Sequence, residues 1–287
     1  MPAPGKVVHF LLTSLVLATA LALPSDTPDS LPAKLRQRGD AKRVVVVGGN
    51  IGRNNIYHCS ADQVETIESA VQNMRRLAAN AYNFLLEDNS HTTAAYIAWF
   101  GEKHATEGWA IAIRRNIYDG IWSVGSKVDA YVASLDAVDD AIVRGCATPE
   151  TEPECSQTET EITHALAYKP DGFMKLCTSY FSLSSDYSRA YNLWGSERRE
   201  HETLGRALLH EMTHMSVVVG SKWITGDPGY GPDESLGLPD DKKIDNADSF
   251  KLFTLEIEAN PVNSKRQVDM KLREKKDTIA KRLLRGD

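Results

Sequence analysis

Apolar residues recur at every third or fourth position over a long stretch of the chain after Ser60. The stretch opens with Ser60-Ala61-Asp62-Gln63, which has the form of a capping box at a helix start. The apolar positions that follow are Val64, Ile67, Val71, Met74, Leu77, Ala78, Ala81, Phe84 and Leu85. This spacing places them on one face of a helix, so the sequence predicts one long amphipathic helix here.

Three further segments show the same helical spacing. Residues 92–101 predict a short second helix, and residues 109–121 predict a third that is rich in aromatic side chains. A fourth helix, over 128–142, is predicted from Val128, Tyr131, Val132, Leu135, Val138 and Ile142. We expect the aromatic residues of these helices to belong to the core.

The pattern changes after Cys146. Residues 148–160 form a loop rich in Pro and Glu, and two short apolar runs follow, at 162–168 and 173–176. Between them stands Lys169-Pro170-Asp171-Gly172, in which Pro presets one turn dihedral and Gly accepts a positive φ. The segment therefore predicts a hairpin, and with it a small antiparallel sheet.

A metal-binding pattern lies on the next predicted helix, at 200–219. His210 and His214 are four residues apart, so both imidazoles lie on one face and can reach one metal ion. Glu211 stands beside the first histidine, where it can take a proton from a water molecule on the metal. This is the H-E-x-x-H arrangement of zinc peptidases; the alternative is a pair of histidines on an ordinary helix surface.

A catalytic zinc site usually has three protein ligands. No histidine follows His214, so the third ligand is expected to be a downstream carboxylate. Gly220 and the glycine-rich run at 225–231 would end the helix and turn the chain back. Asp227 would then face the two imidazoles, with Tyr230 close by.

These residues carry a resemblance to a known family. The H-E-x-x-H motif followed closely by T-x-D-x-x-Y-G resembles the aspzincins, which include fungal deuterolysin and peptidyl-lysine metalloendopeptidase. The matching positions are Thr225, Asp227, Tyr230 and Gly231, the N-A-D segment at 246–250, and the segments 96–101 and 176–181. The resemblance extends over residues 59–260.

The resemblance implies an α+β fold, a mostly helical zincin-like metallopeptidase domain with a small antiparallel sheet and the motif on an active-site helix. His210, His214 and Asp227 would bind one Zn²⁺ per chain. Glu211 would be the general base, and Tyr230 would donate a hydrogen bond to the scissile carbonyl as it becomes an oxyanion.

Two further residues bear on the substrate pocket. By the resemblance, Asp248 would be an acidic residue behind the metal ligands or in the substrate pocket. In the lysine-specific branch of the family that this chain resembles, an acidic residue stands three positions after the aspartate that corresponds to Asp248. This chain has Lys251 at that position. We therefore do not expect a strict preference for lysine.

The chain has four cysteines, an even number that generally pairs in an oxidising compartment. Four cysteines allow three connectivities. The resemblance favours Cys59–Cys146 and Cys155–Cys177.

The N-terminus predicts a targeting segment. After Lys6, an uncharged run at 7–23 ends in small-x-small patterns, which is typical of a secretory signal peptide at 1–22. The run is shorter than the about 20 apolar residues that span a membrane, so no stable membrane anchor is expected. Residues 23–43, ending in Lys42-Arg43, have the pattern of a short pro-segment or of a charged linker.

The peptidase-like domain would then occupy residues 44–260, followed by a basic C-terminal extension at 261–287. The extension is either an amphipathic helix for a partner or a membrane surface, or a tail laid on the domain. With 33 basic and 39 acidic residues the net charge is −6, which disfavours nucleic acid as a partner. The glycines at 48–52 do not fit the dinucleotide fingerprint.

The sequence as a whole predicts a secreted, extracellular zinc metalloendopeptidase that acts on protein or peptide substrates and needs Zn²⁺. The alternative is a catalytically weak or inactive zinc-binding protein on the same fold, such as an antigen, scavenger or effector. Glu211 favours the enzyme, because a scavenger needs only the ligands. The natural substrate and the oligomeric state stay open.

Overall fold

The computed structural model describes residues 42–136, 138–156, 162–168 and 172–266. The predicted signal peptide, nearly all of the predicted pro-segment and most of the basic extension lie outside these residues. Within them, no helix is both long enough and apolar enough to cross a membrane.

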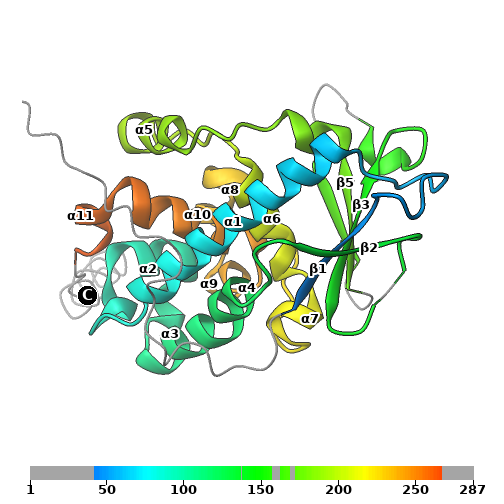
Figure 1. The fold of residues 1–287 in the computed structure, drawn as a ribbon. Helices are drawn as coiled ribbons and strands as arrows, with labels where there is room; N and C mark the ends of the chain where they lie inside the picture. The colour runs from blue at the N-terminus through cyan, green and yellow to red at the C-terminus, as the bar shows by residue number, and fades with distance from the viewer. Residues whose placement is uncertain (1–41, 137, 157–161, 169–171, 267–287) are drawn as a thin grey trace, which may run out of the picture. The chain divides into compact units, whose positions relative to one another are not determined.

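The described chain is α+β, as predicted, with helices and one sheet (Figure 1). The helices are α1 Ala61–Phe84, α2 Ala94–Phe100, α3 Glu107–Ile113, α4 Asp119–Trp122, α5 Tyr187–Glu197, α6 Leu204–Thr213, α7 Ser216–Val219, α8 Gly231–Gly237, α9 Asp240–Lys243, α10 Ala247–Ala259 and α11 Pro261–Ser264. Short 3₁₀ turns lie at Ser90–Thr92, Glu102–His104, Pro153–Cys155 and Thr178–Ser182, and a π-helical turn, Arg114–Tyr118, joins α3 to α4.

The long first helix begins and ends close to its predicted bounds. Ser60 accepts a hydrogen bond from the Gln63 backbone, and the Gln63 side chain accepts one from the Ser60 backbone, so the capping box is confirmed. α1 packs against α4, α6 and α10, and these contacts bury its apolar face. The predicted helices at 92–101 and 109–121 correspond to α2 and to the continuous turns from α3 through α4.

Five strands form the sheet, in the order β2-β1-β3-β5-β4. The strands are β1 Arg43–Val47, β2 Val128–Val132, β3 Ala141–Ala147, β4 Ala165–Tyr168 and β5 Phe173–Cys177. β4 and β5 pair antiparallel, which confirms the hairpin, and Gly172 has the positive φ that the turn requires (68°). The other pairings are parallel, so the sheet is mixed and not antiparallel throughout.

The prediction of a fourth helix at 128–142 is wrong. This segment contains β2 and the first part of β3, separated by a connection in which Asp140 has a positive φ of 55°. Both strands pair in parallel with β1, which lies more than 80 residues earlier in the chain. Val and Ile favour strands when such a partner is available, and this pairing overrides the helical spacing.

The core lies between the sheet and the helices, among them α6, which carries the metal-binding motif. One face of the sheet contributes Val44, Val46, Ile142, Met174 and Leu176 to the main cluster. Every residue of α6 is buried, and α6 contacts α1, α10 and β4. The motif therefore stands on a helix that is held on several sides.

Two disulfides brace the sheet, with the pairing that the resemblance implied. Cys59–Cys146 ties the segment before α1 to β3, and Cys155–Cys177 ties the loop after β3 to the end of β5. No cysteine is free.

Candidate metal centre

The two histidines of the motif lie on one face at the C-terminal end of α6. Their Nε2 atoms are 3.2 Å apart, and both side chains are almost fully buried. α6 begins at Leu204 and ends at Thr213, so it is shorter than the predicted helix at 200–219. His214 itself is the C-terminal cap residue of α6.

Asp227 reaches the histidines because the chain turns back after α7. Gly220 ends that helix with φ of 83°, a value that favours glycine. The returning loop is then pinned from both sides: the Thr225 backbone N–H donates to Thr213 (3.1 Å), and Gly226 exchanges backbone hydrogen bonds with the segment before α10. Asp227 Oδ1 lies 3.2 Å from His210 Nε2, and its Oδ2 lies 3.3 Å from His214 Nε2.

The three donor atoms fit a tetrahedral zinc ion. Zinc binds imidazole and carboxylate ligands at about 2.0–2.2 Å, which places adjacent tetrahedral donors about 3.3–3.5 Å apart. The distances of 3.2, 3.2 and 3.3 Å among His210, His214 and Asp227 are close to this spacing. Among the described residues these three side chains form the cluster able to hold a metal ion. A tetrahedral ion held by these three side chains would have a fourth position for water or substrate.

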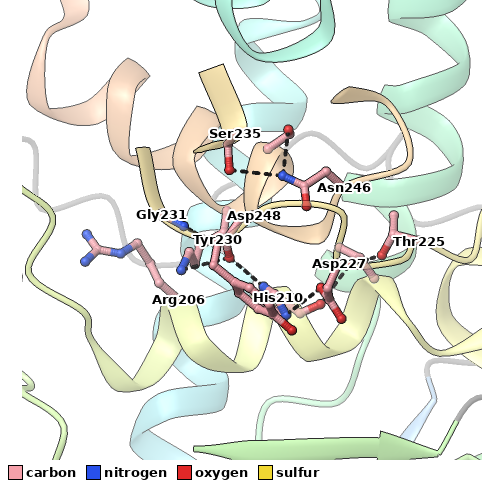
Figure 2. A network of polar contacts seen from close by, with 12 residues as sticks. Arg206, His210, Thr225, Asp227, Tyr230, Gly231, Ser235, Asn246 and Asp248 are labelled. Atoms are coloured by element: carbon pink, nitrogen blue, oxygen red, sulfur yellow. Dashed lines mark hydrogen bonds and ion pairs between the residues drawn. The ribbon is translucent and has the colours of Figure 1, made fainter. Parts of the chain in front are cut away.

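Each histidine has its other ring nitrogen occupied. His214 Nδ1 lies 3.1 Å from the Thr225 carbonyl oxygen. His210 Nδ1 lies 2.7 Å from Asp248 Oδ1, as Figure 2 shows. A proton on Nδ1 leaves the Nε2 lone pair free for the metal. These contacts therefore select the tautomer that a zinc ligand needs.

Asp248 joins the histidine helix to the loop after Asp227. Its Oδ2 accepts a hydrogen bond from the Gly231 backbone N–H at 2.6 Å, and its side chain is 2% exposed. It lies in the first turn of α10, where a carboxylate is favoured by the helix dipole. The structure thus places Asp248 directly behind His210.

The electrostatics of the site favour a cation. Burial alone would lower the pKa of His210, but hydrogen bonds to Asp227 and Asp248 outweigh it and raise that pKa to about 10. Hydrogen bonds to His210 and His214 hold the pKa of Asp227 far below its usual range, against the effect of burial. Carboxylates that favour a positive charge here so strongly also favour a divalent metal ion.

Glu211 lies next to this cluster and is buried. Burial raises the pKa of its carboxyl, and the neighbouring histidines and a hydrogen bond from the Ala167 backbone oppose that shift. A carboxylate with a raised pKa accepts a proton more readily, as a general base requires. The contact with Ala167 also places Glu211 beside β4.

Tyr230 lies over the other side of His210. The two rings are stacked, with centroids 6.1 Å apart and planes at 19°, and Tyr230 is 59% exposed. Partial burial, together with the negative charges of Asp227 and Glu211, raises the pKa of Tyr230 to about 12. Its hydroxyl is therefore a neutral hydrogen-bond donor at the open side of the site.

Sequence reasoning missed a second layer of charged residues behind Asp248. Glu200 and Glu202, in the loop before α6, contact Lys251 of α10, and Glu202 also lies near Arg206. The loop segment around Glu202 was expected to start a helix, but α6 begins only at Leu204. The spacing of Lys251 three residues after Asp248 was the one signal in the sequence, because such residues are neighbours on a helix.

The chain is similar to known metal-dependent peptidases. The family model described as lysine-specific metallo-endopeptidase, the aspzincin model, matches residues 85–255, more than half of the chain. No curated protein matches. Among solved structures, a zinc peptidase from Grifola frondosa is similar, with 19% identity and a TM-score of 0.47, over 71% of this chain and 99% of that chain. The chain belongs to the aspzincin family and is a metallopeptidase.

Proposed function

We propose that this protein is a secreted zinc endopeptidase that hydrolyses peptide bonds within proteins, with His210, His214 and Asp227 as the zinc ligands. The observation that carries the proposal is the convergence of three donor atoms at 3.2–3.3 Å, beside a buried Glu211. The donor set is one that zinc prefers, and family membership makes metal-dependent peptide hydrolysis the expected chemistry.

Bound zinc would polarise the scissile carbonyl and make water a stronger acid. The chain's own residues would do the rest. Glu211 would accept a proton from the attacking water at its carboxylate and then transfer it to the leaving amine. Tyr230 would donate its hydroxyl hydrogen to the carbonyl oxygen as negative charge develops there. Asp248 would keep the His210 ring in the orientation and tautomer that bind the metal.

The substrate would lie in extended form along β4. This strand forms one edge of the described sheet, and an edge strand offers unpaired backbone groups to another extended chain. β4 also contacts α6, and the hydrogen bond from Ala167 brings it next to Glu211. A peptide paired with this edge would pass in front of the general base.

Strict cleavage at lysine is not proposed, although the family description names that residue. An acidic pocket attracts a substrate lysine through unpaired carboxylates. In this chain the Lys251 ammonium already forms ion pairs with Asp248, at 2.9 Å, and with Glu200 and Glu202. An internal ammonium therefore takes the place that a substrate ammonium would need.

The domain organisation is part of the proposal. A signal peptide at 1–22 would direct secretion, consistent with the two disulfides, and a cut after Arg43 would release a pro-segment at 23–43. Val44 would become the new N-terminus. Its backbone nitrogen lies 2.8 Å from Asp129 Oδ2, so the carboxylate is in place to pair with the new ammonium. The proposed extension at 261–287 begins with α11, which packs against α2 and α10, and Ser264 is fully buried.

The test measures zinc content and casein cleavage for the secreted chain, with its N-terminus read by mass spectrometry. We expect one zinc per chain in the parent and in Glu211→Gln, cleavage by the parent at sites not limited to lysine, and a rate about 10²- to 10⁴-fold lower for Glu211→Gln. Glu197→Gln, an exposed change on α5, is the matched control and should behave as the parent.

Two results would contradict the proposal in different ways. Zinc in both proteins without cleavage by either, on a chain that begins at Val44, would favour a zinc-binding antigen, scavenger or effector. A parent chain that binds no zinc would overturn both functions.

A further inference from the structure

Lys251 is a buried cation held among carboxylates. Its Nζ lies 3.1 Å from Glu200 Oε1, 2.7 Å from Glu202 Oε2 and 2.9 Å from Asp248 Oδ1. Only 6% of Lys251 is exposed, and Asp248 is 2% exposed. Arg206 is the other cation of the cluster, with Nε 3.8 Å from Glu202, and its side chain is fully buried.

Lys251 and the metal-binding histidine meet on the same oxygen atom. Asp248 Oδ1 accepts a hydrogen bond from His210 Nδ1 at 2.7 Å and lies 2.9 Å from Lys251 Nζ. The second oxygen, Oδ2, accepts the backbone N–H of Gly231 at 2.6 Å. Three donors from α6, α8 and α10 therefore fix one carboxylate.

We propose that Lys251 is a positioning residue for the metal site: its ammonium holds the Asp248 carboxylate where that carboxylate orients His210, and Glu200 and Glu202 balance its charge. This inference rests on the proposed function, in which His210 binds zinc through Nε2. The ion pairs of Lys251 are with Glu200, Glu202 and Asp248, none of them a proposed zinc ligand, so it acts on the metal site through Asp248.

The charge balance shows why the ammonium matters. Three carboxylates converge on Lys251. If it were removed, Arg206 would remain near Glu202 and His210 would remain beside Asp248. Buried like charges at such distances repel strongly, because little water screens them. Asp248 would lower that repulsion by moving away from Glu200 and Glu202, and any such movement changes its contact with His210. A neutral residue at position 251 should therefore loosen the imidazole.

The test is the zinc affinity of Lys251→Met, measured by competition with a chromophoric chelator at fixed pH. Loss of a partner behind a metal ligand typically weakens metal binding about 10- to 100-fold, and we expect about tenfold for Lys251→Met. The matched control is Lys243→Met. Lys243 is also a buried lysine, but its Nζ donates to the Ala98 carbonyl oxygen, outside the cluster. Its replacement should leave zinc affinity unchanged.

A double-mutant cycle separates positioning from a general loss of structure. In an Asp248→Asn background, Lys251→Met should weaken zinc binding little further, because the residue through which it acts has already been altered. An equal loss in both backgrounds would overturn the proposal, as would an affinity for Lys251→Met within about twofold of the parent. If Lys251→Met does not fold, Lys251→Gln removes the same charge, and the same outcomes apply to it.

The outcomes also distinguish this inference from the proposed function. A parent chain that fails to bind zinc contradicts the function itself. A parent that binds zinc and cleaves casein, but shows additive effects in the cycle, contradicts only the role of Lys251.

Discussion

The two ends of α10 carry polar networks that are built from similar residues. The C-terminal network is formed by Glu256 and Glu258. Glu258 accepts hydrogen bonds from Arg76 (2.9 Å) and Asn80 (2.5 Å), and Glu256 accepts one from the indole of Trp194 (2.7 Å). In each of these contacts a side chain of α10 binds a side chain of α1 or α5, so the network joins these three helices.

The N-terminal network, formed by Asp248 and Lys251, continues to the proposed metal site. Asp248 and Lys251 are as buried as the glutamates, but the chain of contacts continues to His210, whose Nε2 faces Asp227. One imidazole nitrogen is satisfied by the protein, and the other is left for a ligand. The comparison teaches that burial and charge alone do not identify a functional site. A side chain that is held in place at one atom, and whose second donor atom can still bind a ligand, does identify one. Changes at the two ends should therefore separate zinc binding from stability.

The largest effect is expected for Asp227→Asn. The amide keeps the shape of the side chain but removes the negative charge that lies 3.2–3.3 Å from both imidazoles. We expect zinc affinity to fall by more than the about 10- to 100-fold that is typical of residues behind the ligands. Equilibrium dialysis against buffered zinc measures this. Glu258→Gln, in the C-terminal network, is the control and should bind zinc as the parent does.

A change in the C-terminal network should lower stability and leave zinc affinity unchanged. Glu256→Ala leaves the Trp194 indole N–H buried without its acceptor and removes a partner of Arg198. An unsatisfied buried donor costs about 1–3 kcal/mol of unfolding free energy. Urea unfolding of the zinc-free protein should show this loss, while zinc affinity stays at the parent value. A drop in zinc affinity comparable to that of Lys251→Met would contradict the separation of the two networks.

The first three predicted helices and the motif could be found in the sequence because their signals are local. Each signal involves residues that are only a few positions apart: the capping box at Ser60, the apolar spacing through α1, and the two histidines one turn apart. The return of Asp227 could also be anticipated, since Gly220 marks the end of a helix. Which acidic residue would return came from the resemblance and not from the spacing.

The strands and the charged layer depend on partners that are remote in sequence. Residues 128–142 have helical spacing, yet they form β2 and the start of β3 because β1 is available beside them. Likewise, nothing near Lys251 indicates that Glu200 and Glu202 will meet it, since both come from a loop about fifty residues earlier. Such contacts exist only once α6 and α10 have packed together.

The smallest expected effect concerns the pH dependence of the N-terminal network. Burial raises the pKa of Glu200 to about 7, with Glu202 adding to the shift and Lys251 and Arg206 opposing it. The folded protein then retains a proton that the unfolded chain has already lost above about pH 4.5, so the contribution of Glu200 to the unfolding free energy declines as the pH rises from about 5 to 7. One such proton gives a slope of at most about 1.4 kcal/mol per pH unit. Glu200→Gln should flatten the decline in urea unfolding of the zinc-free protein at pH 5, 6 and 7, whereas the exposed Glu197→Gln should not. An unchanged slope in Glu200→Gln would show that the excess negative charge around Lys251 is relieved at another carboxyl.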